Sequence, residues 1–473
     1  MKINMRIEIQ DYLFLHEKYK EPALTHRRFK HKDIVPLIED LKKTKLFKVS
    51  EIGRSVQNRS IFELQYGHGA KKVMLWSQMH GDEPTATMAI FDVINFLCGP
   101  DSDSYQQVRN DIRENLTLVF IPLLNPDGAE LFQRRNAQQI DLNRDARAME
   151  APEARLLGER AKVHQPMYGF NLHDQNIYYN VPNTTNPVGI SFLAPAYNWL
   201  RETNEVRGRA MQIIAGMFEM LDELVPNTVA KYDDTHSPRG FGDNFQSWGT
   251  STILIESGAR KGDPEKQEIR KLNFMCLLRA FKLISSDSYS KYSISDYENI
   301  PFNASQLHDV VIRNVEVMQN GIAAKIDIAI RREEHTVKGD YYTKGYIEDL
   351  GDLKDEYGYD ELFEEGLKFV PGEAAKGVLK EVNKELVADY LKKGVVAIEL
   401  NKEANSSILE NRLHGYPLEL YFGGSYKPAE SLSLGERATF LLAGKSGVKY
   451  AVVNGYLIDV NAPYQQEFKM NFL

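Results

Sequence analysis

The chain has 473 residues, of which 42% are hydrophobic and 26% charged, and its formal net charge is −8. These values are typical of a globular protein with more than one domain. The acidic balance gives no basis for binding nucleic acid or an anionic membrane surface, and no apolar run of about 18 residues predicts a membrane span.

The N-terminal segment and the cysteine content bear on where the protein works. Residues 1–20 mix charged and apolar side chains and contain no apolar signal core. Cys98 and Cys276 are the only two cysteines, which is no disulfide framework for a secreted protein. We therefore expect a cytoplasmic protein.

The chain up to about residue 285 alternates short apolar runs with longer helical patterns, which is typical of α/β architecture. The predicted strands are Val73–Gln78, Leu116–Leu124, Tyr168–His173 and Thr252–Ile255. The predicted helices are Pro84–Leu97, Pro152–Val163, Asn204–Leu224 and Pro264–Ile284. We expect a mixed sheet flanked by helices.

Polar residues follow or end these strands, namely His80, Asn125, His173 and Glu256. Open α/β sheets place their ligand sites at the carboxyl edge of their strands. The pattern therefore predicts that these four side chains lie near one site.

The character of the sequence changes near residues 285–302, where serine and tyrosine replace helical periodicity. We expect a first domain at residues 1–290 and a smaller β-rich domain at residues 304–473. Strands of the second domain are predicted at Val310–Val317, Ala324–Ile330, Val395–Leu400, Ala438–Leu442 and Tyr450–Ile458. The acidic segment Glu348–Glu365 is interpreted as a solvated loop and helix.

A histidine and a glutamate three residues apart, His80 and Glu83, follow the strand at Val73–Gln78. From the turn after a strand both can face one metal ion, although a surface ion pair is the alternative for an isolated pair of this kind. Gly81 is expected to permit a tight turn and Pro84 to begin the helix. His173, 90 residues beyond Glu83, would be a third donor, leaving a fourth zinc position for water.

Asp141-Leu142-Asn143-Arg144 places a carboxylate, an amide and a guanidinium within four residues. Arginine suits bidentate recognition of a carboxylate, and asparagine can donate beside it. Asp141 is able to orient a metal-bound imidazole. The alternative is a loop stabilised by its own ion pair.

Arg134 and Arg135 precede that tetrapeptide, and one of them would stabilise the oxyanion that forms when water attacks a carbonyl. Glu256 follows an apolar strand, where an unpaired carboxylate is costly unless it serves chemistry or finds a partner. It is therefore a candidate general base.

The order of these motifs resembles the M14 metallocarboxypeptidase family. The matching features are Phe47–Ser55, the HGDE, NPDG, DLNRD and PEARLL motifs and the ILIES strand, and they cover about residues 15–290. The resemblance implies a zinc exopeptidase fold and zinc ligation by His80, Glu83 and His173, a two-histidine, one-glutamate set of the kind carboxypeptidase A uses.

The same resemblance assigns the remaining roles. Glu256 would be the general base and acid, and Asn143 and Arg144 would hold the free carboxylate of a peptide substrate. Arg134 fits the family's oxyanion arginine better than Arg135 does, because of its spacing to the DLNRD motif.

Some features depart from the family pattern. The family's tyrosine upstream of the catalytic glutamate has no clear counterpart, and Tyr232 is the nearest candidate. The pocket would draw on residues 234–251, where Asp243 suggests a basic substrate side chain and Phe241 an apolar one.

Three alternatives stay open. The interval before His173 also suits N-acyl amino acid deacylases of the aspartoacylase and succinylglutamate desuccinylase type, although the NPDG turn and the long segment before Glu256 favour a peptidase. Cleavage of peptidoglycan-type peptides is a second alternative. The third is a metal-retaining protein that binds carboxylates without hydrolysis, which the presence of Glu256 disfavours.

Overall fold

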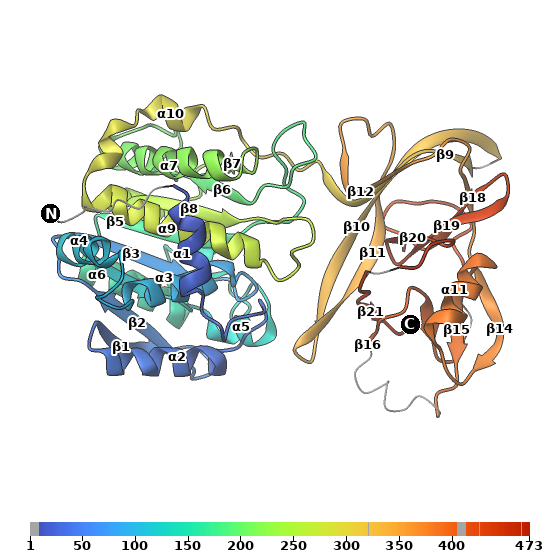
Figure 1. The fold of residues 1–473 in the computed structure, drawn as a ribbon, viewed down its shortest axis with the longest axis horizontal. Helices are drawn as coiled ribbons and strands as arrows, with labels where there is room; N and C mark the ends of the chain where they lie inside the picture. Colours follow the sequence, from blue (N-terminus) through green and yellow to red (C-terminus); the bar gives the residue numbers. More distant parts are fainter. Residues whose placement is uncertain (1–8, 320, 404–412, 425, 465) are drawn as a thin grey trace. The chain divides into compact units, whose positions relative to one another are not determined.

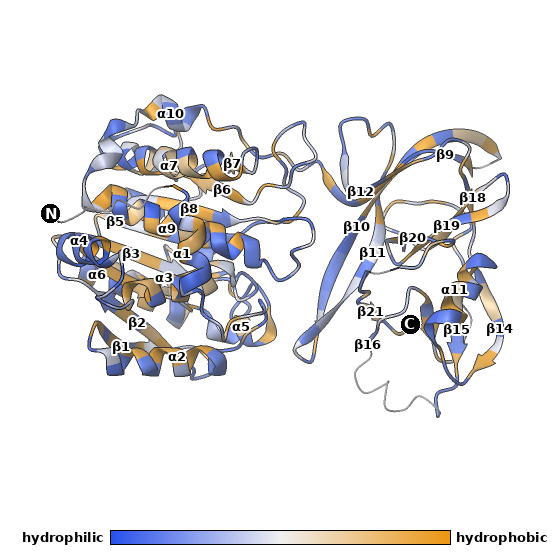
Figure 2. Ribbon diagram, in the orientation of Figure 1, coloured by the Kyte–Doolittle hydropathy of each residue, from blue (hydrophilic) through white to orange (hydrophobic). Residues whose placement is uncertain are grey.

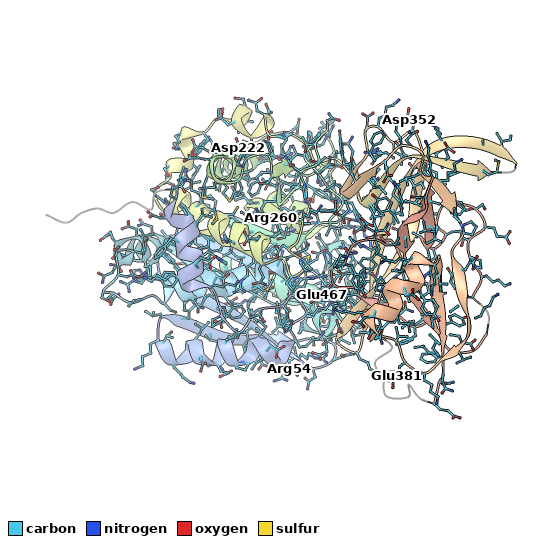
Figure 3. The ribbon with its side chains drawn as sticks, turned by 45° about the vertical axis from the view of Figure 1, so that its right-hand side comes forward. Arg54, Asp222, Arg260, Asp352, Glu381 and Glu467 are labelled. Carbon is cyan, nitrogen blue, oxygen red and sulfur yellow. The ribbon has the colours of Figure 1, made fainter. Side chains whose placement is uncertain are left out.

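A computed structural model describes residues 9–319, 321–403, 413–424, 426–464 and 466–473. The chain forms two compact units that divide between Ser305 and Gln306 (Figure 1). Charged side chains such as Arg54, Asp222 and Asp352 lie at the surface of the units (Figure 3). Within the described ranges, no helix is both long enough and apolar enough to cross a membrane.

An eight-stranded sheet forms the centre of the first unit, in the order β1-β2-β4-β3-β5-β8-β6-β7. Its strands are β1 Phe47–Arg54, β2 Ser60–Tyr66, β3 Lys71–Ser77, β4 Leu116–Ile121, β5 Tyr168–Asp174, β6 Ile190–Leu193, β7 Val229–Lys231 and β8 Ser251–Ser257. The central strands β4, β3, β5 and β8 are parallel, whereas β2 and β6 flank them in antiparallel orientation. The carboxyl ends of the four parallel strands therefore meet at one edge.

Helices flank this sheet, which confirms the predicted fold class. They are α1 Asp11–Tyr19, α2 His31–Thr44, α3 Thr85–Leu97, α4 Gln106–Asn115, α5 Pro126–Leu131, α6 Pro152–His164, α7 Glu205–Leu224, α8 Phe241–Ser247, α9 Gln267–Ser285 and α10 Ile294–Glu298, with short 3₁₀ turns η1 Leu142–Arg144 and η2 Ser288–Lys291. Hydrophobic and hydrophilic residues alternate along α2 and α7, as expected for helices with one buried face (Figure 2).

Alternate residues of each central strand pack into different cores, because successive side chains point to opposite faces of a sheet. Val73 and Leu75 of β3 belong to the core that also contains residues of α3, α7 and α9. Met74 and Trp76 belong to a second core with residues of α6 and α8. Both faces of the sheet are thus covered.

Two strands, β4 and β8, end two or more residues away from their predicted ends. β4 stops at Ile121, and the predicted turn at Asn125 begins helix α5, since the Asn125 side chain accepts a hydrogen bond from the Gly128 amide at 2.9 Å. β8 continues to Ser257 because its pairing with β5 continues there. Glu256 therefore lies within a strand and has a fixed neighbour on β5.

Gly81 lies in a tight turn, as predicted, because the Glu83 amide donates a hydrogen bond to the His80 carbonyl at 3.2 Å. The residue in the left-handed conformation is Gln78, with φ of 51°. At Gly81 a Cβ atom would lie 2.0 Å from the backbone carbonyl carbon of Gly128. The glycines of the HGDE and NPDG motifs therefore allow the loop after β3 to pack directly on α5.

The serine- and tyrosine-rich segment near residues 285–302 packs with the first unit. It contains η2 and α10, and Tyr292, Tyr297 and Ile300 are buried in the first unit's core. Bridges Asn180↔Ala304 and Lys231↔Phe302 tie the end of the segment to this unit.

The second unit is rich in β structure, as expected. Its larger sheet has the order β11-β10-β9-β13-β18-β19-β20, and β12 pairs with β9. The strands of this unit are β9 Leu307–Gln319, β10 Ile322–Val337, β11 Asp340–Gly351, β12 Tyr357–Phe363, β13 Lys368–Val370, β14 Glu373–Leu379, β15 Val395–Leu400, β16 Leu413–His414, β17 Glu419–Tyr421, β18 Phe440–Gly444, β19 Gly447–Val453, β20 Tyr456–Asp459 and β21 Met470–Asn471. Strands β14, β15 and β17 form a small parallel sheet, and α11 Lys384–Lys392 precedes β15.

Two predictions in the second unit were wrong. The acidic segment Glu348–Glu365 is not a loop and helix, because it contains the end of β11 and all of β12. Several of its acidic side chains remain partly or fully exposed, so a strand tolerates them. The single strand predicted at Tyr450–Ile458 is a hairpin, with Asn454 and Gly455 both at positive φ in the turn.

Candidate metal centre and active site

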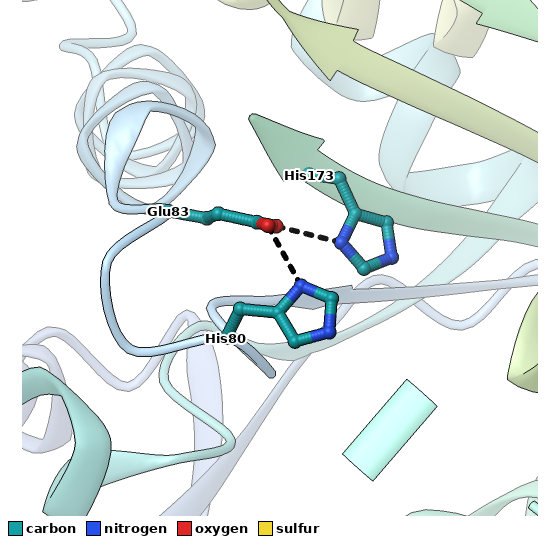
Figure 4. A group of neighbouring side chains, drawn as sticks. All are labelled: His80, Glu83 and His173. Carbon is teal, nitrogen blue, oxygen red and sulfur yellow. Dashed lines mark hydrogen bonds and ion pairs between the residues drawn. The ribbon is translucent and has the colours of Figure 1, made fainter. Parts of the chain in front are cut away.

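Three buried side chains from the first unit converge at the carboxyl edge of its sheet. The Glu83 carboxylate lies between two imidazoles, with Oε1 2.8 Å from Nδ1 of His80 and Oε2 2.7 Å from Nδ1 of His173 (Figure 4). One donor atom from each residue lies within 4.8 Å of the other two. Among the described residues, this is the one group of three or more histidine, cysteine or acidic side chains so arranged.

The fold explains how residues distant in sequence meet here. His80 lies three residues beyond the end of β3, and His173 is the second-last residue of β5, the strand that pairs with β3. The Asn125 side chain donates to the Met79 carbonyl at 3.1 Å and so fixes the backbone next to His80. Glu83 also accepts a hydrogen bond from the Asp174 amide at 3.2 Å.

Asp141 lies behind His80. Its Oδ1 is 3.1 Å from Nε2 of His80. The imidazole of His80 therefore contacts Asp141 through Nε2 and Glu83 through Nδ1. Asp141 also accepts from the Asn143 amide at 2.9 Å and from Nε of Arg134 at 3.0 Å. This is the arrangement in which a carboxylate fixes the tautomer of a metal-binding imidazole.

Electrostatics inside the cluster favour an ionised glutamate. Burial opposes a charged Glu83, but His80 and His173 outweigh it and hold the pKa of Glu83 well below its usual value. Burial lowers the pKa of His173. In His80 burial is outweighed by Glu83 and Asp141, which raise its pKa to about 9. An ionised carboxylate and two imidazoles form a donor set that zinc accepts.

Glu256 lies beside His173, because the two residues are directly paired across β5 and β8. Burial and the negative charge of Glu83 raise the pKa of Glu256 well above its usual value. No side chain or amide in the described ranges donates a hydrogen bond to its carboxylate. A carboxyl group with an increased proton affinity, next to a candidate metal centre, is suited to accept a proton.

A cavity of about 350 Å³ is lined by all the residues predicted to bind metal, act in catalysis or hold the substrate carboxylate, whereas Asp141, Asn125 and Phe241 do not line it. Arg144 is exposed and lines this cavity, and its Nη1 donates to the Asn143 carbonyl at 2.7 Å. The Asn143 carboxamide is anchored by the Phe241 amide at 2.9 Å and lies 3.4 Å from Nε2 of His173. Arg134, with 42% of its side chain exposed, donates to Glu83 at 3.1 Å.

Tyr232 lines the same cavity, and its hydroxyl lies 3.4 Å from that of Tyr179. The sequence pattern indicated Tyr232 but not Tyr179, which belongs to no motif. Asp243 also lines the cavity and accepts hydrogen bonds from His236 at 3.0 Å and from the Ser237 amide at 2.8 Å.

The suggestion that Phe241 forms an apolar pocket wall was wrong. The residue is fully buried and packs with Trp76 and Phe245 in the core beneath α8. Asn171, in contrast, lines the cavity, although no sequence motif gave it a role. Its separation of two residues from His173 on one strand was the signal that could have identified it.

Other motif residues have structural contacts. Asp127 of the NPDG motif accepts hydrogen bonds from Ser55, the Gln57 amide and Arg59. Glu153 of the PEARLL motif is fully buried and accepts from Asn136 at 3.0 Å. These residues hold the loops behind the site.

Part of the first unit matches the model of a known protein family. Residues 34–172 match the model of the zinc carboxypeptidase family, Peptidase_M14. This segment is therefore similar to the zinc carboxypeptidases of that family. It contains His80, Glu83 and the 134–144 loop, and it ends one residue before His173.

One curated protein that resembles this chain is a carboxypeptidase. Carboxypeptidase SOL1 of Arabidopsis thaliana is 28% identical over 132 residues, which cover 26% of this chain and 26% of that protein. The match thus spans about a quarter of that relative's length.

Solved structures that align with this chain include a metallo-carboxypeptidase from Burkholderia cenocepacia. The TM-score is 0.45 at 16% identity, over 55% of this chain and 70% of the other. Carboxypeptidase A from Helicoverpa armigera gives 0.44 at 14% identity, over 60% and 81% of the two chains.

Proposed function

We propose that the protein is a zinc-dependent carboxypeptidase that hydrolyses the C-terminal peptide bond of peptides. The observation that carries this proposal is the cavity in which His80, Glu83 and His173 converge and Glu256 lies beside them. The match of residues 34–172 to the M14 family model supports it.

The donor set fits a zinc ion. Two imidazoles and an ionised carboxylate face one point, and Asp141 holds the far nitrogen of His80. When bound there, zinc supplies Lewis acidity toward the scissile carbonyl and the attacking water.

The chain's own residues would perform the remaining steps. Glu256 takes a proton from the attacking water and transfers it to the leaving amine. Arg134 faces the developing oxyanion with a guanidinium that Asp141 orients. Arg144 and Asn143 hold the terminal carboxylate of the substrate. We assign this chemistry to the first unit, whose residues provide the whole cluster.

A panel of matched substrates tests the proposal. Peptides with free or amidated C-termini and N-acyl amino acids are incubated with the protein, with and without zinc. We expect release of one residue from the free-terminus peptides only, and only with zinc. Cleavage confined to N-acyl amino acids would show a deacylase instead. Zinc binding with no hydrolysis would favour a carboxylate-binding protein.

A further inference from the structure

The cavity extends from the candidate metal centre along one face of β5, β8 and β6. Asn171 precedes His173 by two residues on β5, so both side chains point to the same face, about 6.6 Å apart along the strand. Asn171 pairs with Leu254 just as His173 pairs with Glu256, and Leu193 of β6 pairs with Leu254 from the other side. All of these residues line the cavity. Asn171, Leu254 and Leu193 therefore form a row across the three strands, here called the inner row. It lies two residues along the strands from His173 and Glu256.

Asn171 is the unusual member of this inner row. It is 1% exposed, and neither its Oδ1 nor its Nδ2 has a hydrogen-bond partner among the described residues. Buried polar atoms are nearly always paired, because an unpaired one loses its hydration without compensation. A carboxamide that lines a cavity with both ends unpaired is thus available to a ligand.

Gly242 and Asp243 of α8 complete the surroundings of the inner row. A Cβ atom at Gly242 would lie 3.3 Å from Nδ2 of Asn171 and 3.2 Å from Cγ of Pro195. The glycine therefore keeps open the space in front of the carboxamide. Asp243 adds a carboxylate to the same cavity, held in place by His236 and the Ser237 amide.

We infer that the inner row holds the side chain of the released residue, and selects one that ends in an N–H donor. Such an end is the carboxamide of glutamine or the amine of lysine. Oδ1 of Asn171 and the Asp243 carboxylate accept its N–H groups, while Leu193 and Leu254 pack against its methylenes. An apolar end leaves Asn171 unpaired, and an acidic end is repelled by Asp243. This inference rests on the proposed carboxypeptidase function.

The test uses zinc-loaded full-length protein and N-blocked tripeptides that differ only in the last residue: glutamine, lysine, methionine or glutamate. We expect kcat/KM for glutamine or lysine to exceed that for methionine at least about tenfold, with glutamate the poorest, since a missing hydrogen-bond partner is strongly discriminated. Methionine or glutamate as the best terminal residue would overturn the inference.

Variants of the cavity distinguish the two possible N–H donors, the carboxamide of glutamine and the amine of lysine. Asn171→Leu should lower the glutamine-to-methionine ratio at least about tenfold, and Asn171→Ser serves if the leucine variant does not fold. Asp243→Asn should impair lysine more than glutamine, because the amine loses its counter-charge whereas the carboxamide of glutamine still finds an accepting oxygen on asparagine. An unchanged glutamine-to-methionine ratio in folded, zinc-containing Asn171 variants would overturn the role of the carboxamide.

A pair of glycine substitutions provides the steric control. Gly242→Ala should impair the glutamine and lysine peptides more than an alanine-terminated peptide. Gly208→Ala in α7, where a Cβ would lie 3.3 Å from its nearest neighbour against 3.2 Å at Gly242, should leave all of them unchanged. Equal effects of the two variants would contradict the placement of the substrate side chain.

The same assay distinguishes the side-chain preference from the proposed function. Cleavage of every peptide without preference overturns only the side-chain inference. Failure to cleave any free-terminus peptide overturns the proposed function, and the inference with it.

Discussion

Glu419 in the second unit and Glu256 in the first are both carboxylates on β-strands, in very different surroundings. Glu419 is fully buried, and its two oxygens accept hydrogen bonds from Arg437 at 2.5 Å each and from Thr439 at 2.7 Å. Glu256 faces a cavity and receives no hydrogen bond from the described residues, and burial and Glu83 raise its pKa.

The histidines of the two units show a similar contrast. His308 of the second unit pairs with Glu356 at 2.9 Å and is not part of a larger group among the described residues. His80 and His173 share one carboxylate and face each other across it. The chain compensates Glu419 by itself, which marks it as structural, whereas the carboxylate of Glu256 is left for a ligand to compensate, which indicates chemistry.

The largest effects are expected when either of the two histidines that share the Glu83 carboxylate is replaced. His80→Ala and His173→Ala should each reduce bound zinc from about one per chain to below about a tenth, because two ligands do not form a closed site. His308→Ala is the matched control and should leave zinc unchanged. Metal content measured by mass spectrometry checks this, and unchanged zinc in both site variants would refute the ligand assignment.

The two glutamates provide the next test. Glu256→Gln should retain zinc and thermal stability and lower kcat by about 10²–10⁴-fold, because glutamine keeps the shape but is not a base. Glu419→Gln should cost about 2 kcal/mol of unfolding free energy, since Arg437 loses its partner, and leave kcat unchanged. Denaturant unfolding and steady-state kinetics on both variants suffice. Half of the wild-type kcat in Glu256→Gln would remove this residue from the mechanism.

Arg144 tests whether the cavity recognises a free carboxylate. Arg144→Ala should lower kcat/KM for free-terminus peptides about 10²-fold, with part of the loss in kcat because a misplaced substrate reacts slowly. Lysine should restore only part of the loss, since it lacks the two-donor fork. Arg147, exposed a few residues later, is the control position for alanine substitution.

The interaction itself is isolated by combining two changes. If Arg144 contacts the carboxylate, amidating the peptide and deleting the arginine should not give additive losses. Additive losses would make Arg144 a structural residue and remove the main support for exopeptidase action.

The smallest effect concerns Asp141. Asp141→Asn keeps the size of the side chain but removes the charge that faces His80 and Arg134, and should weaken zinc binding about 10–100-fold without abolishing it. Competition with a chelator measures this affinity. An unchanged affinity would show that the Asp141–His80 contact does not tune the metal site.

The sequence alone indicated the fold class and the set of candidate site residues. Apolar runs of strand length bounded by turn residues are local signals, and they identified β3, β5 and β8 within a few residues. Because polar residues follow such strands, the convergence of His80, His173 and Glu256 could be expected from the order of residues along the chain.

Only the tertiary structure decided which motif residues face the cavity. Asp127 and Glu153 hold loops, Gly81 serves a close backbone contact in addition to its turn, and Phe241 points into the core. In a sequence, a residue needed for chemistry and one needed for packing show the same pattern. Strand register places Asn171 beside Leu254, and the position of α8 places Gly242 in front of it. Both the register and the helix position are set by contacts between segments far apart in the chain.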